Sequence, residues 1–353
     1  MIPQPTDDQA TMAPPHVSVI IPCLNEVRHI GDCIKSVFRQ QKPEGGFEVI
    51  VADGMSNDGT RAIVTQLAAK HPMLRLIDNP GRIVSTGLNQ AIRQARGQII
   101  VRLDAHTEYA SDYIQNCVQA LDTAGADNVG GPWIAQGTRY ISRAIAAAFQ
   151  CPWVVGGARG HDLAFEGDVD TVYLGCWRKS AFEKFGYFDD ELVRNQDDEL
   201  SLRIIRLGGR IWQSPSIRSR YHPRGSLRGL FRQYAQYGYW KVRVIQKHRL
   251  PASCRHLVPA VLVLALIGLG TMALFSKVAL ALWLCVVGAY GLFNLAASVA
   301  SAAEGGVALL PMLPAVVACY HFGYGYGFWH GLWDFIICRK GTRPSFCCLT
   351  RSS

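Results

Sequence analysis

Two acidic motifs have the residue types and the spacing needed to handle a phosphorylated substrate. The first runs Asp53-Gly-Met-Ser-Asn-Asp58, where a carboxylate beside turn-forming residues can accept hydrogen bonds from a ribose or a nucleobase. The second is Asp104-Ala-His106, where a carboxylate and an imidazole can reach one divalent cation and the diphosphate that it neutralises. Oxygen ligands suit Mg2+ and Mn2+, and an imidazole ligand favours Mn2+.

A third acidic motif, Asn195-Gln196-Asp197-Asp198-Glu199, offers a general base that can take a proton from an acceptor hydroxyl. Mutual repulsion among adjacent acids helps to hold one of them at a raised pKa. Each motif also has a simpler interpretation when it is taken alone: a turn, a chance surface pair, and favourable charge at the start of a helix. The order of the motifs along the chain favours the chemical interpretation.

Alternating strands and helices must position these motifs. The apolar patterns predict strands at 17–21, 47–52, 74–77, 98–103 and 172–177, and helices at 26–40, 60–70, 83–96 and 199–207. This alternation predicts an α/β domain with a mostly parallel sheet, spanning residues 16–250. Ligands of such sheets bind beyond the carboxyl ends of the strands, where Glu26, Asp53, Asp58 and Asp104 are expected.

The chain becomes strongly apolar after residue 250. Uncharged runs at 257–275 and 278–303 are long enough to cross a bilayer core of about 30 Å. A third run, 307–337, contains prolines, histidines and Asp334, and is expected to span once and then lie along the surface. We therefore expect two or three transmembrane helices within 251–340, followed by a tail at 341–353. Buried core helices of a soluble protein are the alternative interpretation.

Positive charge is concentrated directly before these apolar runs. The formal net charge is +9, and no acidic residue occurs between Glu199 and Glu304. Such a flank is typical of the cytoplasmic side of membrane helices and of anionic lipid surfaces, so 217–250 is expected to be a basic interfacial segment. No zinc-finger or aromatic-basic RNA motif accompanies it, which argues against nucleic-acid binding. Residues 1–15 lack the apolar core of a signal peptide and are expected to be disordered, which favours a cytoplasmic domain.

Five ordered motifs resemble those of glycosyltransferase family 2. They are Ile21-Pro22-Cys-Leu-Asn25-Glu26, Asp53 to Thr60, Asp104-Ala-His106, Gly175-Cys-Trp-Arg178, and Gln196-Asp197-Asp198-Glu199-Leu200 with Arg203. The resemblance covers residues 17–213 and implies a GT-A nucleotide-diphospho-sugar transferase fold, followed here by C-terminal transmembrane helices. It implies a metal and diphosphate motif at Asp104 and His106 and a catalytic base at Asp197. The implied nucleotide-sugar contacts are Pro22, Asn25, Glu26, Asp53, Asp58 and Asp104.

This sequence departs from the family pattern at two positions. His106 stands where the metal motif usually has a second aspartate, and Gln196 stands where a glutamate usually precedes the base. Imidazole can replace a carboxylate as a metal ligand, so the expected cofactor is Mn2+ or Mg2+, with His222 as a further candidate ligand.

Three runs, together with the C-terminal membrane region, resemble bacterial exopolysaccharide transferases of the succinoglycan glucosyltransferase type: Arg102-Leu-Asp-Ala-His106, Val169-Asp-Thr-Val-Tyr-Leu-Gly175, and Asn195 to Leu200. The run Gln236-Tyr-Gly-Tyr-Trp240 is similar to the Gln-x-x-Arg-Trp motif of processive synthases, with Tyr239 replacing the arginine, and an interfacial aromatic helix is an equal alternative. The candidate acceptor-side residues are Gly175, Arg178, Asp198, Gln236 and Trp240.

The resemblance implies an inverting transferase at the inner membrane of a bacterial cell, with its catalytic domain in the cytoplasm. A UDP-sugar, with UDP-glucose preferred, is the implied donor, and an undecaprenyl-diphosphate-linked saccharide is the implied acceptor. Two alternatives share the fold: a polyprenyl-phosphate monosaccharide transferase and a processive polysaccharide synthase. A non-catalytic nucleotide-binding membrane scaffold is the alternative from a different class.

Overall fold

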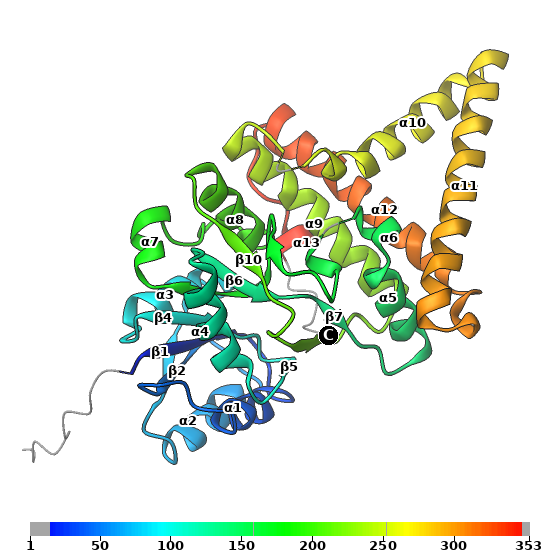
Figure 1. The fold of residues 1–353 in the computed structure, drawn as a ribbon. Helices are drawn as coiled ribbons and strands as arrows, with labels where there is room; N and C mark the ends of the chain where they lie inside the picture. Colours follow the sequence, from blue (N-terminus) through cyan, green and yellow to red (C-terminus); the bar gives the residue numbers. More distant parts are fainter. Residues whose placement is uncertain (1–14, 158, 252, 348–353) are drawn as a thin grey trace, which may run out of the picture.

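The computed structural model describes residues 15–157, 159–251 and 253–347. The segment expected to be disordered, 1–15, lies outside the described residues apart from Pro15, as do residues 348–353 of the expected tail. Two parts are visible in Figure 1: a sheet domain that begins at the N-terminus, and a helical part formed mainly by the chain after residue 226.

The first half of the sheet alternates strands and helices. It contains β1 (Val17–Cys23), β2 (Phe47–Asp53), β3 (Leu74–Asp78) and β4 (Ile99–Arg102), connected by α1 (Ile30–Phe38), α2 (Thr60–Ala68) and α3 (Val84–Gln94). β1 pairs in parallel with β2 and with β4, and β2 pairs in parallel with β3. Every residue of β1 and β2 is buried because helices cover both faces of the sheet. The predicted parallel arrangement is confirmed.

The sheet continues with strands from a later part of the chain. Its order is β3-β2-β1-β4-β9-β6-β10-β8. The added strands are β6 (Asn128–Gly131), β8 (Gly167–Asp168), β9 (Tyr173–Arg178) and β10 (Ile211–Gln213). β9 runs antiparallel to its neighbours β4 and β6. Its first residue, Tyr173, therefore lies at the edge where the parallel strands end.

Helices make the sheet the middle of three layers. One face is covered by α1, α2 and α4 (Tyr113–Ala124), and the other by α3, α7 (Ser180–Phe185) and α8 (Gln196–Arg206). A small second sheet, in the order β5-β11-β7, joins β5 (Thr107–Tyr109), β11 (Ser219–Tyr221) and β7 (Ile134–Ala135). It lies between the large sheet and the helical part.

The helical part is built around two closely packed helices, α9 (Leu227–His248) and α12 (Leu313–Gly331). A Cβ on Gly327 would lie 1.8 Å from the Ala235 carbonyl oxygen, and one on Gly238 would lie 2.0 Å from the Tyr324 carbonyl oxygen. Only glycine permits these approaches of two helix backbones. Gly323, Gly327 and Gly331 of the third apolar run thus serve packing against α9, and Gly325 serves packing against α10.

The remaining elements surround this pair. They are α5 (Tyr140–Gln150), α6 (Pro152–Val155), η1 (Arg159–His161), η2 (Cys254–His256), α10 (Val258–Met272), α11 (Lys277–Gly305), η3 (Val307–Leu309), the π-helix η4 (Leu332–Ile337) and α13 (Pro344–Cys347). α5, α11 and α12 share one apolar core, and α9, α12 and α13 share a second.

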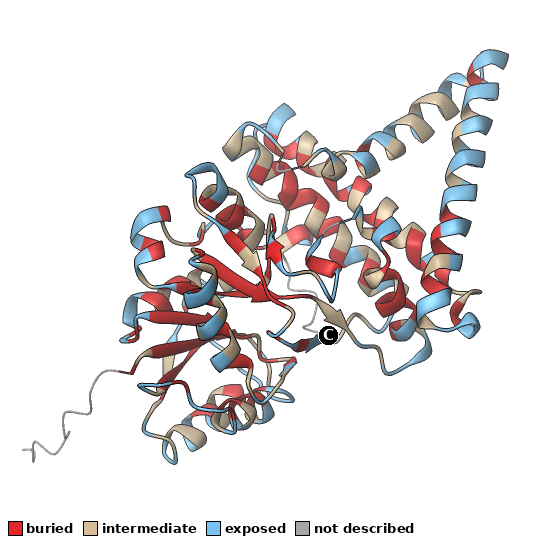
Figure 2. Ribbon diagram, in the orientation of Figure 1, coloured by how far each residue is buried: buried red, intermediate tan, exposed pale blue. Residues whose placement is uncertain are grey.

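α10 and α11 extend away from the rest of the molecule (Figure 1), and much of their surface is exposed (Figure 2). Large apolar side chains contribute to that surface, including Leu264, Phe275 and Leu292. Among the described residues, the segments Cys254–Met272 and Lys277–Gly305 are the two that are long and apolar enough to cross a membrane. Exposed apolar surface of this extent is typical of a membrane-contacting region.

Two predicted helix boundaries are wrong. The first helix begins at Ile30, because residues 24–29 form a loop beyond β1. The helix expected at 199–207 begins at Gln196, so Asp197, Asp198 and Glu199 form its first turn and do not precede it. Asn195 has a φ of 61° and turns the chain into this helix.

Candidate active site

A cavity of about 950 Å³ runs from the carboxyl edge of the sheet to the helices α10, α11 and α12. At the sheet end its lining includes most of the predicted nucleotide, metal and catalytic residues, namely Pro22, Asn25, Glu26, Asp104, His106 and Asp197, together with Asp198 from the predicted acceptor side. These residues come from three separate motifs, and the fold brings them together at one end of the cavity.

The loops after β1 and β2 are tied together by hydrogen bonds. The Asn25 backbone N–H donates to Ser56 Oγ at 2.8 Å, and the Glu26 N–H donates to Thr60 Oγ1 at 2.9 Å. Asp58 accepts from the backbone N–H groups of Val27 (3.1 Å) and Thr60 (3.0 Å). Partial burial would raise the pKa of Asp58. The two backbone bonds and a further bond from the Thr60 hydroxyl outweigh it and lower that pKa. Asp58 thus fixes the loop that presents Glu26 and is not itself part of the cavity lining.

Asp53 is fully buried at the end of β2. Its Oδ2 accepts from the Ser56 N–H at 2.9 Å and pairs with Arg61 Nη1 at 2.8 Å, and Arg61 also binds Asp78 at 2.7 Å. The Asp53 carboxylate shapes the turn behind the cavity and is not among the lining residues. Direct contact between Asp53 and a nucleotide stays a prediction.

Asp104 and His106 lie just beyond β4 and both face the cavity. The Asp104 backbone is fixed by Tyr109, whose hydroxyl accepts from the Asp104 N–H at 2.7 Å. His106 Nδ1 lies 3.3 Å from Glu26 Oε1, which links the metal motif to the loop after β1. One carboxylate and one imidazole are suitable donors for Mn2+ or Mg2+.

The described residues contain no group of three or more His, Cys, Asp or Glu side chains that could hold a metal ion. His222, the further candidate, has its Nε2 3.0 Å from Glu108 Oε1 and its Nδ1 3.2 Å from the Gln136 carbonyl oxygen. It lies outside the cavity lining, so the expectation that His222 joins Asp104 and His106 is not met. Oxygen atoms of a bound diphosphate and water would have to complete the coordination of an ion at Asp104 and His106.

Arg102, the last residue of β4, connects two acids of the site. Its Nη1 donates to Asp197 Oδ1, and its Nη2 lies 3.3 Å from Asp104 Oδ1. The guanidinium is only 5% exposed, and a buried cation of this kind requires such partners. Sequence reasoning did not identify Arg102 as a site residue, although a charged residue within the apolar run Ile99-Ile-Val was a usable signal.

Two neighbouring aspartates on α8 experience opposite electrostatic environments. Burial, followed by the repulsion of Asp104 and Asp198, raises the pKa of Asp197 against the opposing attraction of Arg102. Burial would also raise the pKa of Asp198, but the Lys241 ammonium at 2.6 Å lowers it. Asp197 therefore has the raised pKa expected of a proton acceptor, whereas Lys241 on α9 favours the ionised form of Asp198.

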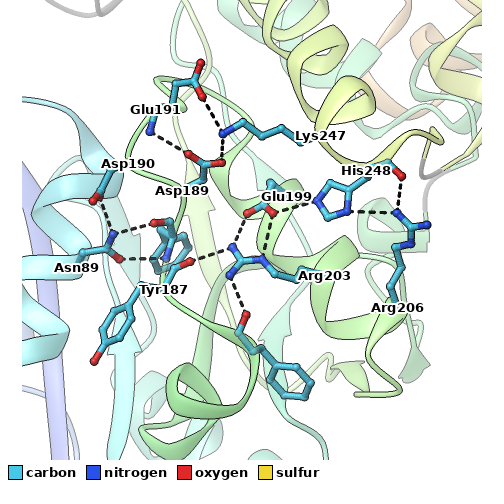
Figure 3. Close-up of polar contacts among 12 residues, drawn as sticks. Asn89, Tyr187, Asp189, Asp190, Glu191, Glu199, Arg203, Arg206, Lys247 and His248 are labelled. Atoms are coloured by element: carbon cyan, nitrogen blue, oxygen red, sulfur yellow. Dashed lines mark hydrogen bonds and ion pairs between the residues drawn. The ribbon is translucent and has the colours of Figure 1, made fainter.

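A polar network that starts at Glu199, the residue after Asp198, holds α8 in place (Figure 3). Glu199 pairs with Arg203 one turn later and with His248 Nε2 at 3.0 Å, at the end of α9. Arg203 also donates to the carbonyl oxygens of Phe185 (2.7 Å) and Tyr187 (2.9 Å). Figure 3 shows Lys247 reaching Asp189 and Glu191 in the preceding loop. These bonds fix the first turn of α8 and therefore the direction of Asp197.

Two of the expected acceptor-side residues lie away from the cavity, on β9. Arg178 pairs across the strands with Ile99 at the start of β4, at the opposite edge of the sheet, and its side chain binds Asp122 at 2.7 Å. Gly175 has a φ of 105°, and a Cβ there would lie 2.3 Å from the Trp177 ring. We correct the expected position of both residues, because β9 is antiparallel and carries them away from the site.

The run from Gln236 to Trp240 is also structural. Trp240 is buried and donates through Nε1 to the Phe346 carbonyl oxygen at 3.0 Å, and Tyr239 stacks on the Phe346 ring at 4.2 Å. Gln236 accepts from Arg194 Nε at 3.2 Å. Gln236 and Trp240 are absent from the cavity lining, so their expected place at the acceptor is corrected as well. Asp198 is the expected acceptor-side residue that the cavity does include.

Comparison with known proteins agrees with this geometry. The family model described as Glycosyl transferase family 2 matches residues 18–150. The chain is 31% identical to the succinoglycan biosynthesis protein ExoA of Rhizobium meliloti, over 90% of this chain and 95% of that protein. It is 28% identical, over 65% of this chain and 74% of the other, to a dolichyl N-acetyl-alpha-D-glucosaminyl phosphate 3-beta-D-2,3-diacetamido-2,3-dideoxy-beta-D-glucuronosyltransferase of Methanococcus voltae.

A solved structure shares the fold. It is the mannosyltransferase PcManGT of Pyrobaculum calidifontis in complex with GDP-Man and Mn2+, with a TM-score of 0.60, 22% identity, and coverage of 91% of this chain and 88% of that chain. The ordered motifs, the sheet topology and these relatives lead to one conclusion. The chain is a glycosyltransferase with a GT-A fold and belongs to glycosyltransferase family 2.

Proposed function

We propose that the chain is a membrane-anchored, inverting glycosyltransferase that adds a sugar to a lipid-linked saccharide in exopolysaccharide biosynthesis. The preferred donor is UDP-glucose, and the acceptor is an undecaprenyl-diphosphate-linked saccharide. The observation that carries this proposal is the single cavity that joins Asp104, His106 and Asp197 to the exposed apolar helices α10 and α11. Such a cavity lets a membrane-held acceptor reach a site that also receives a water-soluble donor.

In the proposed reaction, Asp197 is the general base. Its carboxylate takes the proton of the acceptor hydroxyl while that oxygen forms a bond to the anomeric carbon of the donor sugar. The bond between the anomeric carbon and the diphosphate oxygen breaks from the opposite face, and the nucleoside diphosphate leaves with the electron pair. Arg102 orients the base, because its guanidinium contacts both Asp197 and Asp104.

Asp104 and His106 are the residues that would hold Mn2+ or Mg2+. When bound, a divalent cation neutralises the charge that develops on the leaving diphosphate. The donor atoms present fit such an ion, because they combine a carboxylate with an imidazole at the cavity surface. Glu26, 3.3 Å from His106, would keep the imidazole oriented.

A lipid-linked acceptor is supported by the other end of the cavity. Val258 and Leu262 on α10, and Val286 and Phe293 on α11, line it there. An acyl or polyprenyl chain fits this apolar lining, and the exposed surfaces of both helices suit a bilayer. The Rhizobium relative is named for succinoglycan biosynthesis, and the Methanococcus relative is named for transfer to a dolichyl-linked sugar phosphate. We place the catalytic domain on the cytoplasmic side of a bacterial inner membrane, where nucleotide sugars are made.

A polyprenyl-phosphate monosaccharide transferase is the second candidate, because its lipid would use the same apolar end of the cavity. Its product would retain an acid-labile phosphodiester at the transferred sugar, whereas the preferred reaction forms a glycosidic bond between two sugars. Mild acid cleaves the link to the lipid in both products, but it releases a labelled monosaccharide from the first and a labelled oligosaccharide from the second. The size of the released sugar therefore separates the two candidates.

The test of the proposed function is donor turnover by the full chain in detergent. The reaction contains Mn2+, a lipid extract of native membranes and one labelled nucleotide sugar at a time. Label from one donor in the lipid fraction, abolished by EDTA and restored by Mn2+, is the expected result. Tight nucleotide binding without transfer from any donor would instead support the non-catalytic scaffold. Label entering long water-soluble polymer would support a processive synthase.

A further inference from the structure

The middle of the cavity is formed by aromatic rings that the proposed mechanism does not use. We call them the aromatic wall; all of them line the cavity, and they are Trp133, Phe149, His161, Tyr173 and Tyr221. They come from five separate segments: the β6–β7 connection, α5, η1, β9 and β11. No single stretch of sequence produces such a surface, so it arises from the tertiary fold.

The rings contact one another in a closed series. Consecutive centroids are 5.0 Å apart from Trp133 to His161, 4.4 Å from His161 to Phe149, and 5.9 Å from Phe149 to Tyr221. The series closes at 6.2 Å from Tyr221 to Tyr173 and 5.5 Å from Tyr173 to Trp133. Rings packed at these distances form a rigid surface that gains stability from edge and tilted contacts.

Hydrogen bonds attach the aromatic wall to the catalytic residues on one side and to α9 on the other. The Tyr173 hydroxyl lies 2.9 Å from Oγ1 of Thr107, the residue that follows His106 in the sequence. The Tyr221 hydroxyl accepts from Gln233 Nε2 on α9 at 3.2 Å. The aromatic wall therefore spans the distance between the metal motif and the helical part that continues toward the membrane helices.

His161 adds an unsatisfied polar atom to the aromatic wall. The side chain is only 9% exposed, and its Nδ1 has no hydrogen-bond partner within the part of the chain that the structure describes. Burial, and then the nearby Arg255, lower the pKa of His161 to about 4, so the ring is neutral at pH 7. A neutral imidazole with a buried free nitrogen is stabilised when a hydroxyl donates to it.

We propose that the aromatic wall is the binding subsite for the terminal pyranose of the acceptor. A pyranose presents an apolar face of C–H groups, which packs on aromatic rings, and hydroxyls at its rim. Tyr173, Tyr221 and His161 supply polar atoms beside the rings, as specific sugar recognition requires. This inference rests on the proposed function, because it assigns the acceptor of that same reaction.

Strand order explains why the wall belongs to the acceptor and not to the donor. The nucleotide-side loops follow β1 and β2, whereas Tyr173 and Trp133 belong to β9 and to the segment after β6. β4, which ends just before Asp104, lies between the two groups of strands. In a single displacement the acceptor approaches from the face opposite the leaving diphosphate, and the strands that carry the aromatic wall lie beyond β4 from the nucleotide-side loops.

The kinetic test compares Trp133→Leu with Trp212→Leu. Trp212 is a half-buried tryptophan on β10 that does not line the cavity, so it controls for loss of a large ring from the same sheet. We expect Trp133→Leu to raise the apparent KM for the lipid-extract acceptor by at least about tenfold, the scale of one lost stacking contact. The KM for the nucleotide sugar should stay unchanged, and Trp133→Tyr should restore most of the acceptor affinity. A rise in the donor KM alone, or equal effects of Trp133→Leu and Trp212→Leu, would overturn the proposal.

A binding measurement keeps this test independent of transfer. The full chain in lauryldimethylamine oxide, a detergent without sugar, is titrated with methyl β-glycosides while its tryptophan fluorescence is recorded. We expect a saturable change that Trp133→Leu abolishes and Trp212→Leu preserves. No saturable response of the wild-type chain to any glycoside would overturn the aromatic wall as a sugar subsite. Failure of the proposed function shows itself differently, as absence of transfer from every donor with sugar binding intact.

Discussion

The two ends of the cavity differ in how their residues are brought together. At the sheet end, Glu26, Asp104 and Asp197 follow the ends of strands or start a helix, so each lies in a short motif of the sequence. From the middle of the cavity to the helical end, the aromatic wall and the lining of α10 and α11 come from segments that meet only through tertiary packing. Reactive groups are therefore encoded locally in this chain, whereas the surface that we propose for the acceptor is encoded by the whole fold.

The largest effect is expected where the two ends meet, at the pair between Asp198 on α8 and Lys241 on α9. Lys241→Met leaves the Asp198 carboxylate, whose side chain is 32% exposed, without its ammonium partner at 2.6 Å. We expect the free energy of unfolding to fall by about 3 kcal/mol, the lower end of the range for broken buried pairs, because water reaches part of the Asp198 side chain. Thermal unfolding of the purified chain in detergent measures this loss. The double variant Lys241→Met with Asp198→Leu should recover much of the lost stability, because it leaves no unpaired charge. If the losses of the two single variants simply add in the double variant, the pair does not couple the two ends.

The Asp198–Lys241 pair should also make the stability of the fold depend on pH, in a direction that the structure predicts. Lys241 holds the pKa of Asp198 below its ordinary value despite burial, so the pair stabilises the fold fully above about pH 3.9, the unfolded-state range. That stabilisation is lost as the pH falls through the lower folded-state pKa. Wild-type and Lys241→Met chains should therefore converge in unfolding temperature at acidic pH. A constant difference down to pH 2 would contradict this assignment.

The next effect isolates the membrane end. Leu264 is 51% exposed on α10, and Leu264→Lys places a charge on the surface that we assign to the bilayer. A lysine near the centre of a membrane helix costs about 2.5–3.5 kcal/mol. We expect less protein in the membrane fraction after carbonate washing. Leu207→Lys, at a leucine 60% exposed on the sheet domain, should leave that fraction unchanged. If both variants left the same amount of protein in the membrane fraction, the assignment of α10 to the bilayer would be wrong.

A smaller effect concerns the sheet end alone. Arg102 lowers the pKa of Asp197 against burial and the acids nearby, so Arg102→Gln should raise that pKa further. The base acts only when ionised, and activity is lost as the pH falls through its pKa. The acidic limb of the profile of kcat/KM against pH should therefore move to higher pH. Arg178→Gln, which removes an arginine from the opposite edge of the sheet, should not move it.

The smallest effect separates packing from chemistry within the run Gln236 to Trp240. Tyr239 donates to Asp334 Oδ2 at 3.1 Å and accepts from the Arg343 N–H at 3.0 Å. Tyr239→Phe should cost about 1 kcal/mol of stability per lost hydrogen bond and leave sugar transfer unchanged. A large loss of sugar transfer by Tyr239→Phe, with normal stability, would show that the run Gln236 to Trp240 does belong to the acceptor site.

Sequence patterns predicted the sheet end well because its determinants are local. Buried apolar strands, helical spacing and the motifs at strand ends predicted the α/β class, the parallel strands β1 to β4 and the acids that line the cavity. Arg102 was missed because its two partners, Asp104 and Asp197, come from different motifs. The antiparallel direction of β9, which removed Gly175 and Arg178 from the site, depends on a long connection that no local pattern specifies.

The helical end was harder to predict for the same reason. The apolar runs predicted α10 and α11, but the glycines of α12 gave no sign that their partner was the basic segment that forms α9. The rings of the aromatic wall are spread from Trp133 to Tyr221 and have no common spacing. Only the folded chain brings them to one surface.

The central claim is that Asp197 is the base of a sugar transfer carried out at the sheet end of the cavity. The most direct measurement compares Asp197→Asn with the wild-type chain for transfer of labelled sugar to the lipid extract and for binding of the nucleotide by calorimetry. We predict that transfer falls by about 10²–10⁴-fold, the range for a lost general base, with nucleotide affinity unchanged. Asp122→Asn, at the exposed pair with Arg178, is the matched control and should retain full transfer. Full activity of Asp197→Asn would contradict the assignment.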